Sequence, residues 1–247
     1  MRLERIVIFG ATSAIAQATA RRLARRGARL HLVARDAAKL EAVRADLAAR
    51  GSPGVTVAVA DLGDLARHDA LVDAAESALG SIDAAIIAQG TLPDQKACQD
   101  DFTLTCAQWR TNFIAPASLA AALANRFEAR GAGTIVAISS VAGDRGRASN
   151  YVYGTAKGAL SIFLQGMRAR LHAKAIRVVD VKPGFVDTPM TAAFRKGPLW
   201  AAPDTIAAGI MKAMDRGTPE VYLPWFWRPI MFAIRHIPER IFVRLKL

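Results

Sequence analysis

A tyrosine and a lysine four residues apart, Tyr153 and Lys157, are the residues best suited to chemistry in this sequence. If a helix begins near Tyr153, both side chains emerge on one face of it. An ammonium favours the phenolate, so we expect Lys157 to lower the pKa of the phenol from its ordinary value of about 10. Ser140 follows an apolar run, residues 134–138, that is typical of a buried strand. These three residues predict proton transfer to a carbonyl oxygen at the carboxyl edge of a parallel sheet.

The first residues of the chain predict a nucleotide site. An apolar run over residues 5–9 leads through Gly10 and a short loop into a helical pattern. In a strand, turn and helix of this kind, free amides and the helix dipole meet a pyrophosphate. The alternative for this loop is an ordinary connection between a strand and a helix. For Tyr153 and Lys157 the alternative is a pair of exposed residues on a helix surface.

Arg35 and Asp36 follow the second predicted strand, residues 29–34. The end of that strand faces the adenosine ribose in a dinucleotide-binding sheet, and a guanidinium there can hold a 2′-phosphate bidentately. We therefore predict NADP(H) in preference to NAD(H). Asp36 has an alternative role as the cap of the helix that begins at Ala37.

The remaining apolar runs complete an α/β pattern in one domain, residues 1–223, followed by a basic, aromatic extension, residues 224–247. The predicted fold is a Rossmann-like, doubly wound sheet of seven parallel strands with helices on both faces. A polar loop is expected at residues 91–101, one long helical segment at 109–129 and an irregular lid at 190–203. The other predicted strands are residues 55–60, 82–88, 176–181 and 220–223.

The chain has 247 residues, a formal charge of +12 and only two cysteines. Two cysteines are too few for a disulfide framework and no secretory signal is visible, so we expect a cytoplasmic protein. The four histidines lack ligand spacing, and no metal site is predicted. No recognition motif accompanies the positive charge, and nucleic-acid binding is not expected.

Serine thirteen residues before Tyr153, the Gly10 loop and the segment Pro183-Gly184 together resemble the short-chain dehydrogenase/reductase family along nearly the whole chain. The resemblance implies that Tyr153 is the general acid and base, that Lys157 holds the cofactor ribose and that Ser140, rather than Ser139, contacts the substrate oxygen. It also implies that Asn112 maintains a proton path, and that the protein is a homo-oligomer. The cofactor-binding residues that it implies are Gly10, Thr12, Ser13, Ile15, Arg35, Asp61, Leu62, Ala88, Gly90, Tyr153, Lys157, Pro183, Gly184, Val186 and Thr188.

Two motifs depart from the family's pattern. Alanines, Ala14 and Ala16, occupy the second and third glycine positions of the nucleotide loop, and Ala88-Gln89-Gly90 stands where the family usually has Asn-Ala-Gly. A methyl at Ala14 is acceptable only if the backbone there stays right-handed. Asp61 also has an alternative role, as the cap of the helix predicted near residues 65–79.

The extension combines tryptophans and phenylalanines with arginines. Its longest apolar run, residues 230–234, is far shorter than the roughly 20 residues that cross a bilayer. The composition suits an interfacial segment on the inner face of a membrane, and burial against a partner subunit or over the substrate pocket is the alternative.

The extension and residues 151–157 resemble the decaprenylphosphoryl-2-keto-erythro-pentose reductase subgroup. That resemblance implies a keto-sugar substrate on a polyprenyl phosphate and a flavin oxidase as partner. We expect Arg145 and Arg147 to meet the substrate phosphate, unless both simply face solvent. The alternatives are a soluble ketoreductase of acyl, steroid or small carbonyl substrates and a non-catalytic nucleotide-sensing regulator.

Overall fold

The protein, in a computed structural model that describes residues 3–245, is built on one seven-stranded parallel sheet of order β3-β2-β1-β4-β5-β6-β7. The order runs outward from β1 in one direction and from β4 in the other, so the carboxyl ends of these two strands border a topological switch point. The predicted doubly wound fold is confirmed. The strands are β1 (Arg5–Phe9), β2 (Arg29–Ala34), β3 (Val55–Val59), β4 (Ala84–Ile87), β5 (Ala132–Ile138), β6 (Ala175–Pro183) and β7 (Glu220–Leu223).

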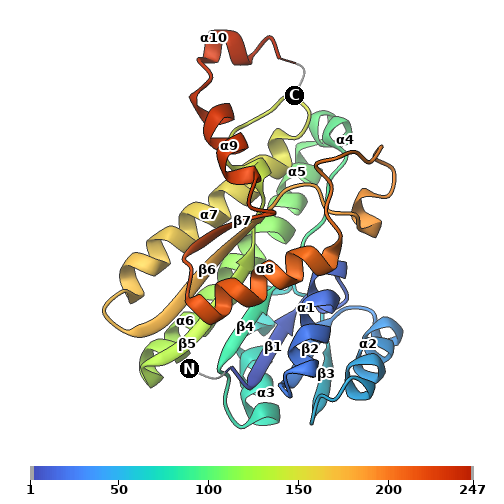
Figure 1. The fold of residues 1–247 in the computed structure, drawn as a ribbon, viewed down its shortest axis with the longest axis vertical. Helices are drawn as coiled ribbons and strands as arrows, with labels where there is room; N and C mark the ends of the chain where they lie inside the picture. Colours follow the sequence, from blue (N-terminus) through green and yellow to red (C-terminus); the bar gives the residue numbers. More distant parts are fainter. Residues whose placement is uncertain (1–2, 246–247) are drawn as a thin grey trace.

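Helices cover both faces of the sheet (Figure 1). On one face, α1 (Ala14–Arg25), α2 (Ala37–Ala49) and α8 (Pro203–Arg216) belong to the same hydrophobic core as Ile6 and Ile8 of β1. On the other, α3 (His68–Leu79), α6 (Ala115–Arg130) and α7 (Tyr151–Leu171) share a core with Val7 and Phe9. Side chains of a strand alternate between its two faces, and both sets are fully buried here, as expected for a parallel sheet covered on both sides.

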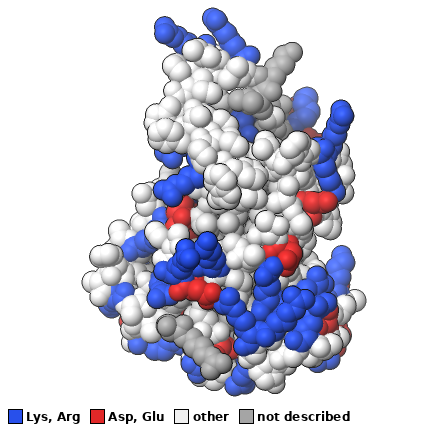
Figure 2. Space-filling view, viewed as in Figure 1, with Lys and Arg blue, Asp and Glu red and all other residues white. Residues whose placement is uncertain are grey.

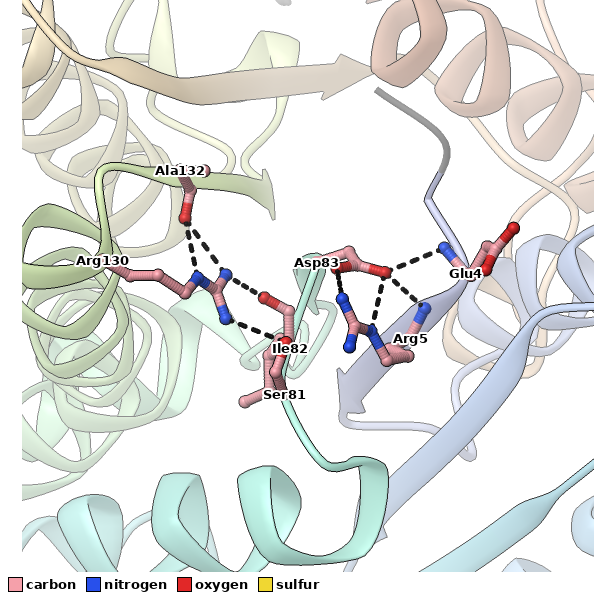
Figure 3. Close-up of polar contacts among 7 residues, drawn as sticks. All are labelled: Glu4, Arg5, Ser81, Ile82, Asp83, Arg130 and Ala132. Carbon is pink, nitrogen blue, oxygen red and sulfur yellow. Dashed lines mark hydrogen bonds and ion pairs between the residues drawn. The ribbon is translucent and has the colours of Figure 1, made fainter.

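Charged side chains tie together the amino ends of three strands, at the edge opposite the carboxyl ends (Figure 3). The Asp83 carboxylate, before β4, accepts hydrogen bonds from the Glu4 and Arg5 amides and from the Arg5 guanidinium. Arg130, at the end of α6, donates to the carbonyls of Ile82 and Ala132. These contacts fix β1, β4 and β5 relative to one another, and the carboxyl ends of the same strands carry the site described below.

Two helical predictions need correction. The predicted polar loop at residues 91–101 contains a short helix, α4 (Gln95–Asp100), which Asp94 caps by accepting from the Ala97 amide at 3.1 Å. The predicted continuous helix at residues 109–129 is divided into α5 (Phe102–Trp109), a π-helical turn (Arg110–Ile114) and α6. The π-helical turn contains Asn112, and such turns inside helices occur frequently at functional sites.

After β7 the chain forms α9 (Trp227–His236) and α10 (Glu239–Phe242), which stand beyond the carboxyl edge of the sheet (Figure 1). Trp227 and Met231 of α9 are buried against Val141 and Tyr222, so the start of the extension packs on the main domain. Lys246 and Leu247, at its end, lie outside the described residues. Among residues 3–245, no helix is both long enough and apolar enough to span a bilayer.

Candidate active site

A cavity of about 830 Å³ opens at the carboxyl ends of the strands. All fifteen residues predicted to bind the cofactor line it, from Gly10 at the first turn to Thr188 after β6. Ser140 lines it as well. The structure therefore gathers residues from both halves of the sheet around one site, at the switch point where open α/β sheets bind ligands.

The first turn has the backbone shape of a dinucleotide cradle. Gly10 has a φ of +76°, and a Cβ there would lie 2.5 Å from the Gln89 amide nitrogen, so only glycine fits. Ser13 caps α1 by accepting from the Ala16 amide at 3.2 Å, and Ala14 starts the helix. No described residue other than glycine has a positive φ, so the backbone at Ala14 is right-handed and accepts a methyl group. The two alanines are thus compatible with a cofactor pyrophosphate at this helix end.

At the adenosine end of the cavity, Asp36 and Arg35 have separate positions. The Asp36 carboxylate caps α2, accepting from the Lys39 amide at 3.0 Å, and pairs with the Lys39 ammonium. Arg35 is exposed, lines the cavity, and has no hydrogen bond or ion pair to another described side chain. The Arg35 guanidinium is therefore available to an anion.

Asp61 also lines the cavity. Its carboxylate accepts from the Gly63 amide at 2.9 Å and does not cap a helix, so its predicted alternative role as a helix cap is wrong.

Tyr153 and Lys157 project from the first two turns of α7, whose start at Tyr151 is two residues earlier than predicted. The Lys157 ammonium donates to the Ile138 carbonyl at 2.9 Å and lies 5.8 Å from the centre of the Tyr153 ring. Burial lowers the pKa of Lys157 to about 8, against an opposing effect of the nearby Asp180 carboxylate. Burial raises the pKa of Tyr153 to about 12, and a hydrogen bond with Ser140 only partly offsets it.

The expectation that Lys157 lowers the pKa of the phenol is therefore wrong for the protein without cofactor. The ammonium is directed at a backbone carbonyl, and desolvation outweighs its influence on the phenol. Tyr153 consequently keeps its proton at neutral pH. A protonated phenol is the form needed to donate a proton to a ketone oxygen.

The two serines after β5 have different partners. Ser139 is turned into the sheet, where its hydroxyl donates to the Asp180 carboxylate. Ser140 lines the cavity, where its Oγ accepts from the Ala142 amide at 3.1 Å and its hydroxyl is hydrogen-bonded with Tyr153. This difference favours Ser140 as the residue that contacts substrate, in agreement with the choice made from the sequence.

Asn112 does not line the cavity. It is fully buried, with its Oδ1 accepting from the Thr91 amide at 3.0 Å and its amide donating to the Gln108 carbonyl at 3.1 Å. A Cβ on Gly90 would lie 3.0 Å from Asn112 Oδ1 and 3.4 Å from Lys157 Nζ. Asn112 and Lys157 thus approach the same glycine, and only this small residue separates the asparagine amide from the lysine ammonium.

Several polar residues that sequence reasoning did not single out also line the cavity. The Gln89 amide, Asn150 Oδ1, Gln95 Nε2 and Trp227 Nε1 are buried and have no hydrogen-bond partner among the described residues. Trp227 comes from the extension, and its indole lies so close to Gly184 that a Cβ there would be 1.9 Å from Nε1. Because this contact joins segments far apart in the sequence, no local motif indicates it.

The fold and this arrangement of residues are those of a nucleotide-dependent oxidoreductase, and comparison with known proteins agrees. The family model for short chain dehydrogenase matches residues 4–198, and the chain belongs to this family. It is 38% identical to an uncharacterized oxidoreductase of Mycobacterium tuberculosis, over 97% of this chain and 96% of the relative. It is 34% identical to an uncharacterized oxidoreductase of Streptomyces coelicolor, over 97% and 95%.

Two solved structures share the architecture. A bulky-bulky ketone specific alcohol dehydrogenase from Comamonas testosteroni superposes with a TM-score of 0.80 and 27% identity, over 97% of this chain and 96% of that one. A short chain dehydrogenase/reductase family protein gives a TM-score of 0.78 and 29% identity, over 90% and 97%. The protein is therefore an NAD(P)-dependent oxidoreductase of this family.

The lowered pKa of Lys157 predicts a pH-dependent cost in stability. An unfolded lysine titrates near 10.5 and Lys157 at about 8, so burying its charge costs up to about 3 kcal/mol below pH 8. Stability from this group rises with pH between these two values, because only the unfolded chain then holds the proton. We expect Lys157→Met to raise the melting temperature of the cofactor-free protein at pH 7 by about 2–8 °C. Differential scanning fluorimetry should show the gain shrinking towards pH 10.

Lys212→Met, at an exposed lysine of α8, is the control and should show no such trend. A lower melting temperature for Lys157→Met at pH 7 would contradict the assigned cost.

Proposed function

We propose that the protein reduces a ketone to an alcohol with NADPH. The observation that carries this proposal is a protonated Tyr153 beside Ser140, in a cavity whose other end has the backbone cradle of a dinucleotide site. The structural similarity to an alcohol dehydrogenase described as specific for bulky ketones supports the same class of substrate.

In this mechanism the residues of the chain place and protonate the ketone, and bound NADPH supplies the hydride. The Ser140 hydroxyl donates a hydrogen bond to the ketone oxygen and stabilises the negative charge that develops there. Tyr153 gives its proton to the same oxygen, and takes one back when the alcohol is oxidised. Lys157, which is charged below pH 8, stabilises the resulting phenolate. Asn112 and Lys157 both approach Gly90.

The preference for NADPH rests on Arg35. Its guanidinium is exposed at the adenosine end of the cavity and has no protein partner among the described residues, while the neighbouring Asp36 is occupied as a helix cap. No carboxylate at the end of β2 is therefore free to accept from a ribose hydroxyl. An unpaired guanidinium is suited to a 2′-phosphate.

For the substrate we propose a keto-sugar carried on a polyprenyl phosphate, supplied by a flavin oxidase, at the inner face of a membrane. Apolar side chains of the extension are exposed, with Trp225 at 76% and Phe232 at 66%. The exposed arginines Arg228, Arg235 and Arg240 accompany them. Figure 2 shows this end of the molecule as a mainly uncharged surface with basic groups at its margin. Such a surface fits an anionic lipid interface.

A soluble ketoreductase with this surface covered by another subunit is the alternative, and a nucleotide-sensing regulator is a second one. The regulator would bind NADPH without turnover of any ketone. Saturable NADPH binding and ketone-dependent NADPH oxidation, measured with and without phospholipid, separate the three.

Tyr153→Phe tests the proposed acid. Removing the hydroxyl leaves the ring in place but removes the donated proton, so we expect kcat for ketone reduction to fall about 100- to 10,000-fold. The dissociation constant for NADPH, measured by fluorescence titration, should stay within about twofold of that of the wild type. Activity close to that of the wild type would exclude this role for Tyr153.

Arg35→Ala tests the cofactor preference. Loss of a charged hydrogen-bonding partner should raise the KM for NADPH about 10- to 100-fold and leave the KM for NADH nearly unchanged. Arg44→Ala, which removes an exposed arginine of α2 that pairs with Glu41, is the matched control. An equal rise of the KM for NADPH and for NADH in Arg35→Ala would show that this residue does not bind the 2′-phosphate.

A double variant, Trp225→Ser with Phe232→Ser, tests the membrane surface. Deleting the whole extension would remove Trp227 from the cavity, whereas these two side chains are exposed. Flotation with vesicles of phosphatidylglycerol and phosphatidylcholine should show binding that falls at least about tenfold in the double variant. Ile162→Ser, at an exposed residue of α7, should bind as the wild type does. Failure of the wild type to float would favour the soluble alternative.

A further inference from the structure

Two arginines of the loop between Ser140 and Tyr153 have opposite environments. Arg145 is bound to the extension: its guanidinium donates to the carbonyls of Ile234 and Ile237, pairs with Glu239 at 2.7 Å and lies 3.8 Å from the centre of the Phe242 ring. It does not line the cavity. The expectation that Arg145 meets a substrate phosphate is therefore wrong, because the last carbonyls of α9 and a carboxylate occupy its donors.

Arg147, two residues later, lines the cavity and has no such partners. Its Nε is buried, and neither Nε nor the rest of the guanidinium donates to any acceptor in residues 3–245. Asp144, the carboxylate that acts on it electrostatically, is already bound by the Lys182 ammonium at 2.9 Å and by the Tyr222 hydroxyl at 2.7 Å. Arg147 is half-buried, and desolvation disfavours a charge that has no hydrogen-bonding partner, so an anion from outside the chain would stabilise the guanidinium.

Other polar groups of the cavity wall also favour a negatively charged ligand. Gln95 also lines the cavity: its Oε1 accepts from the Val152 amide at 3.0 Å, and its Nε2 donor is buried without a partner among the described residues. That contact places Gln95 at the amino end of α7, where the helix dipole also favours negative charge. Asn150, whose backbone amide donates to the Arg147 carbonyl, has a buried Oδ1 without a partner among the described residues, and this acceptor suits a hydroxyl group. This part of the wall is therefore rich in donors.

We propose that Arg147 and Gln95 form an oxyanion-binding subsite for the substrate, and that the ketone carries a phosphate or a carboxylate. A guanidinium fork matches either group through two parallel hydrogen bonds. Arg147 lies on the loop that joins Ser140 to Tyr153 and Gln95 lies at the start of α4, whereas the cofactor cradle lies at Gly10 and Arg35. This inference deepens the proposed ketone reductase, and it depends on that function only for the position of the carbonyl group.

Matched ketones that differ by one anionic group test the subsite. Ribulose 5-phosphate with ribulose, and 2-oxobutanoate with butanone, are titrated into the NADP⁺-saturated protein, and quenching of tryptophan fluorescence is followed, since Trp200 and Trp227 line the cavity. We expect the charged member of at least one pair to bind about tenfold or more tightly. Arg147→Gln should abolish that preference and leave the affinity for the neutral ketone unchanged. The pair that shows the preference identifies the oxyanion.

Lys212→Gln, which removes an exposed positive charge from α8, is the control for net charge and should keep the preference. A wild type without preference in either pair, or an Arg147→Gln variant that retains it, would overturn the subsite. The failure of the reductase function is a different result: charged ketones would still bind through Arg147, but neither they nor the neutral ketones would be reduced by NADPH.

Discussion

The burial of Tyr153 and Lys157 is the constraint on which the rest of the structure depends. Burial works against the charged form of both groups: it raises the pKa of Tyr153 to about 12 and lowers that of Lys157 to about 8. Both residues belong to a long helix, α7, and the Ile138 carbonyl at the end of β5 holds the Lys157 ammonium. At the opposite edge of the sheet, Asp83 and Arg130 hold the amino ends of β1, β4 and β5 together.

The loop that carries Ser140 is anchored to the extension by charged side chains. Asp144 receives the Lys182 ammonium and the Tyr222 hydroxyl, from β6 and β7, and Lys182 also pairs with Glu220 at 2.7 Å. Arg145 then joins the loop to the end of α9. A surface formed by α9 and α10 is thereby connected, through one short loop, to the cavity wall.

The sheet and the cofactor cradle were predictable from the sequence because their signals are local. Runs of buried apolar residues such as 5–9 and 134–138, each followed by a turn, give strand positions, and the parallel fold then fixes which edge carries the polar residues. The pKa of Tyr153 was not predictable in this way. A spacing of four places Lys157 on the same face of the helix, but it does not show that the ammonium is directed at Ile138 or how much water remains around the phenol.

Arg35, Arg145 and Arg147 show most clearly what tertiary structure adds. In the sequence each is a basic residue close to a predicted site, and solvent exposure is a fair expectation for all of them. In the structure Arg145 donates to carbonyl groups at the end of α9, a helix about ninety residues away in the chain, whereas Arg35 and Arg147 line the cavity without a side-chain partner in residues 3–245. Position in the sequence cannot separate a structural arginine from one that awaits a ligand. The deciding quantity is the number of acceptors that the folded chain already places around each guanidinium. For Arg147 we propose that the substrate supplies the acceptor.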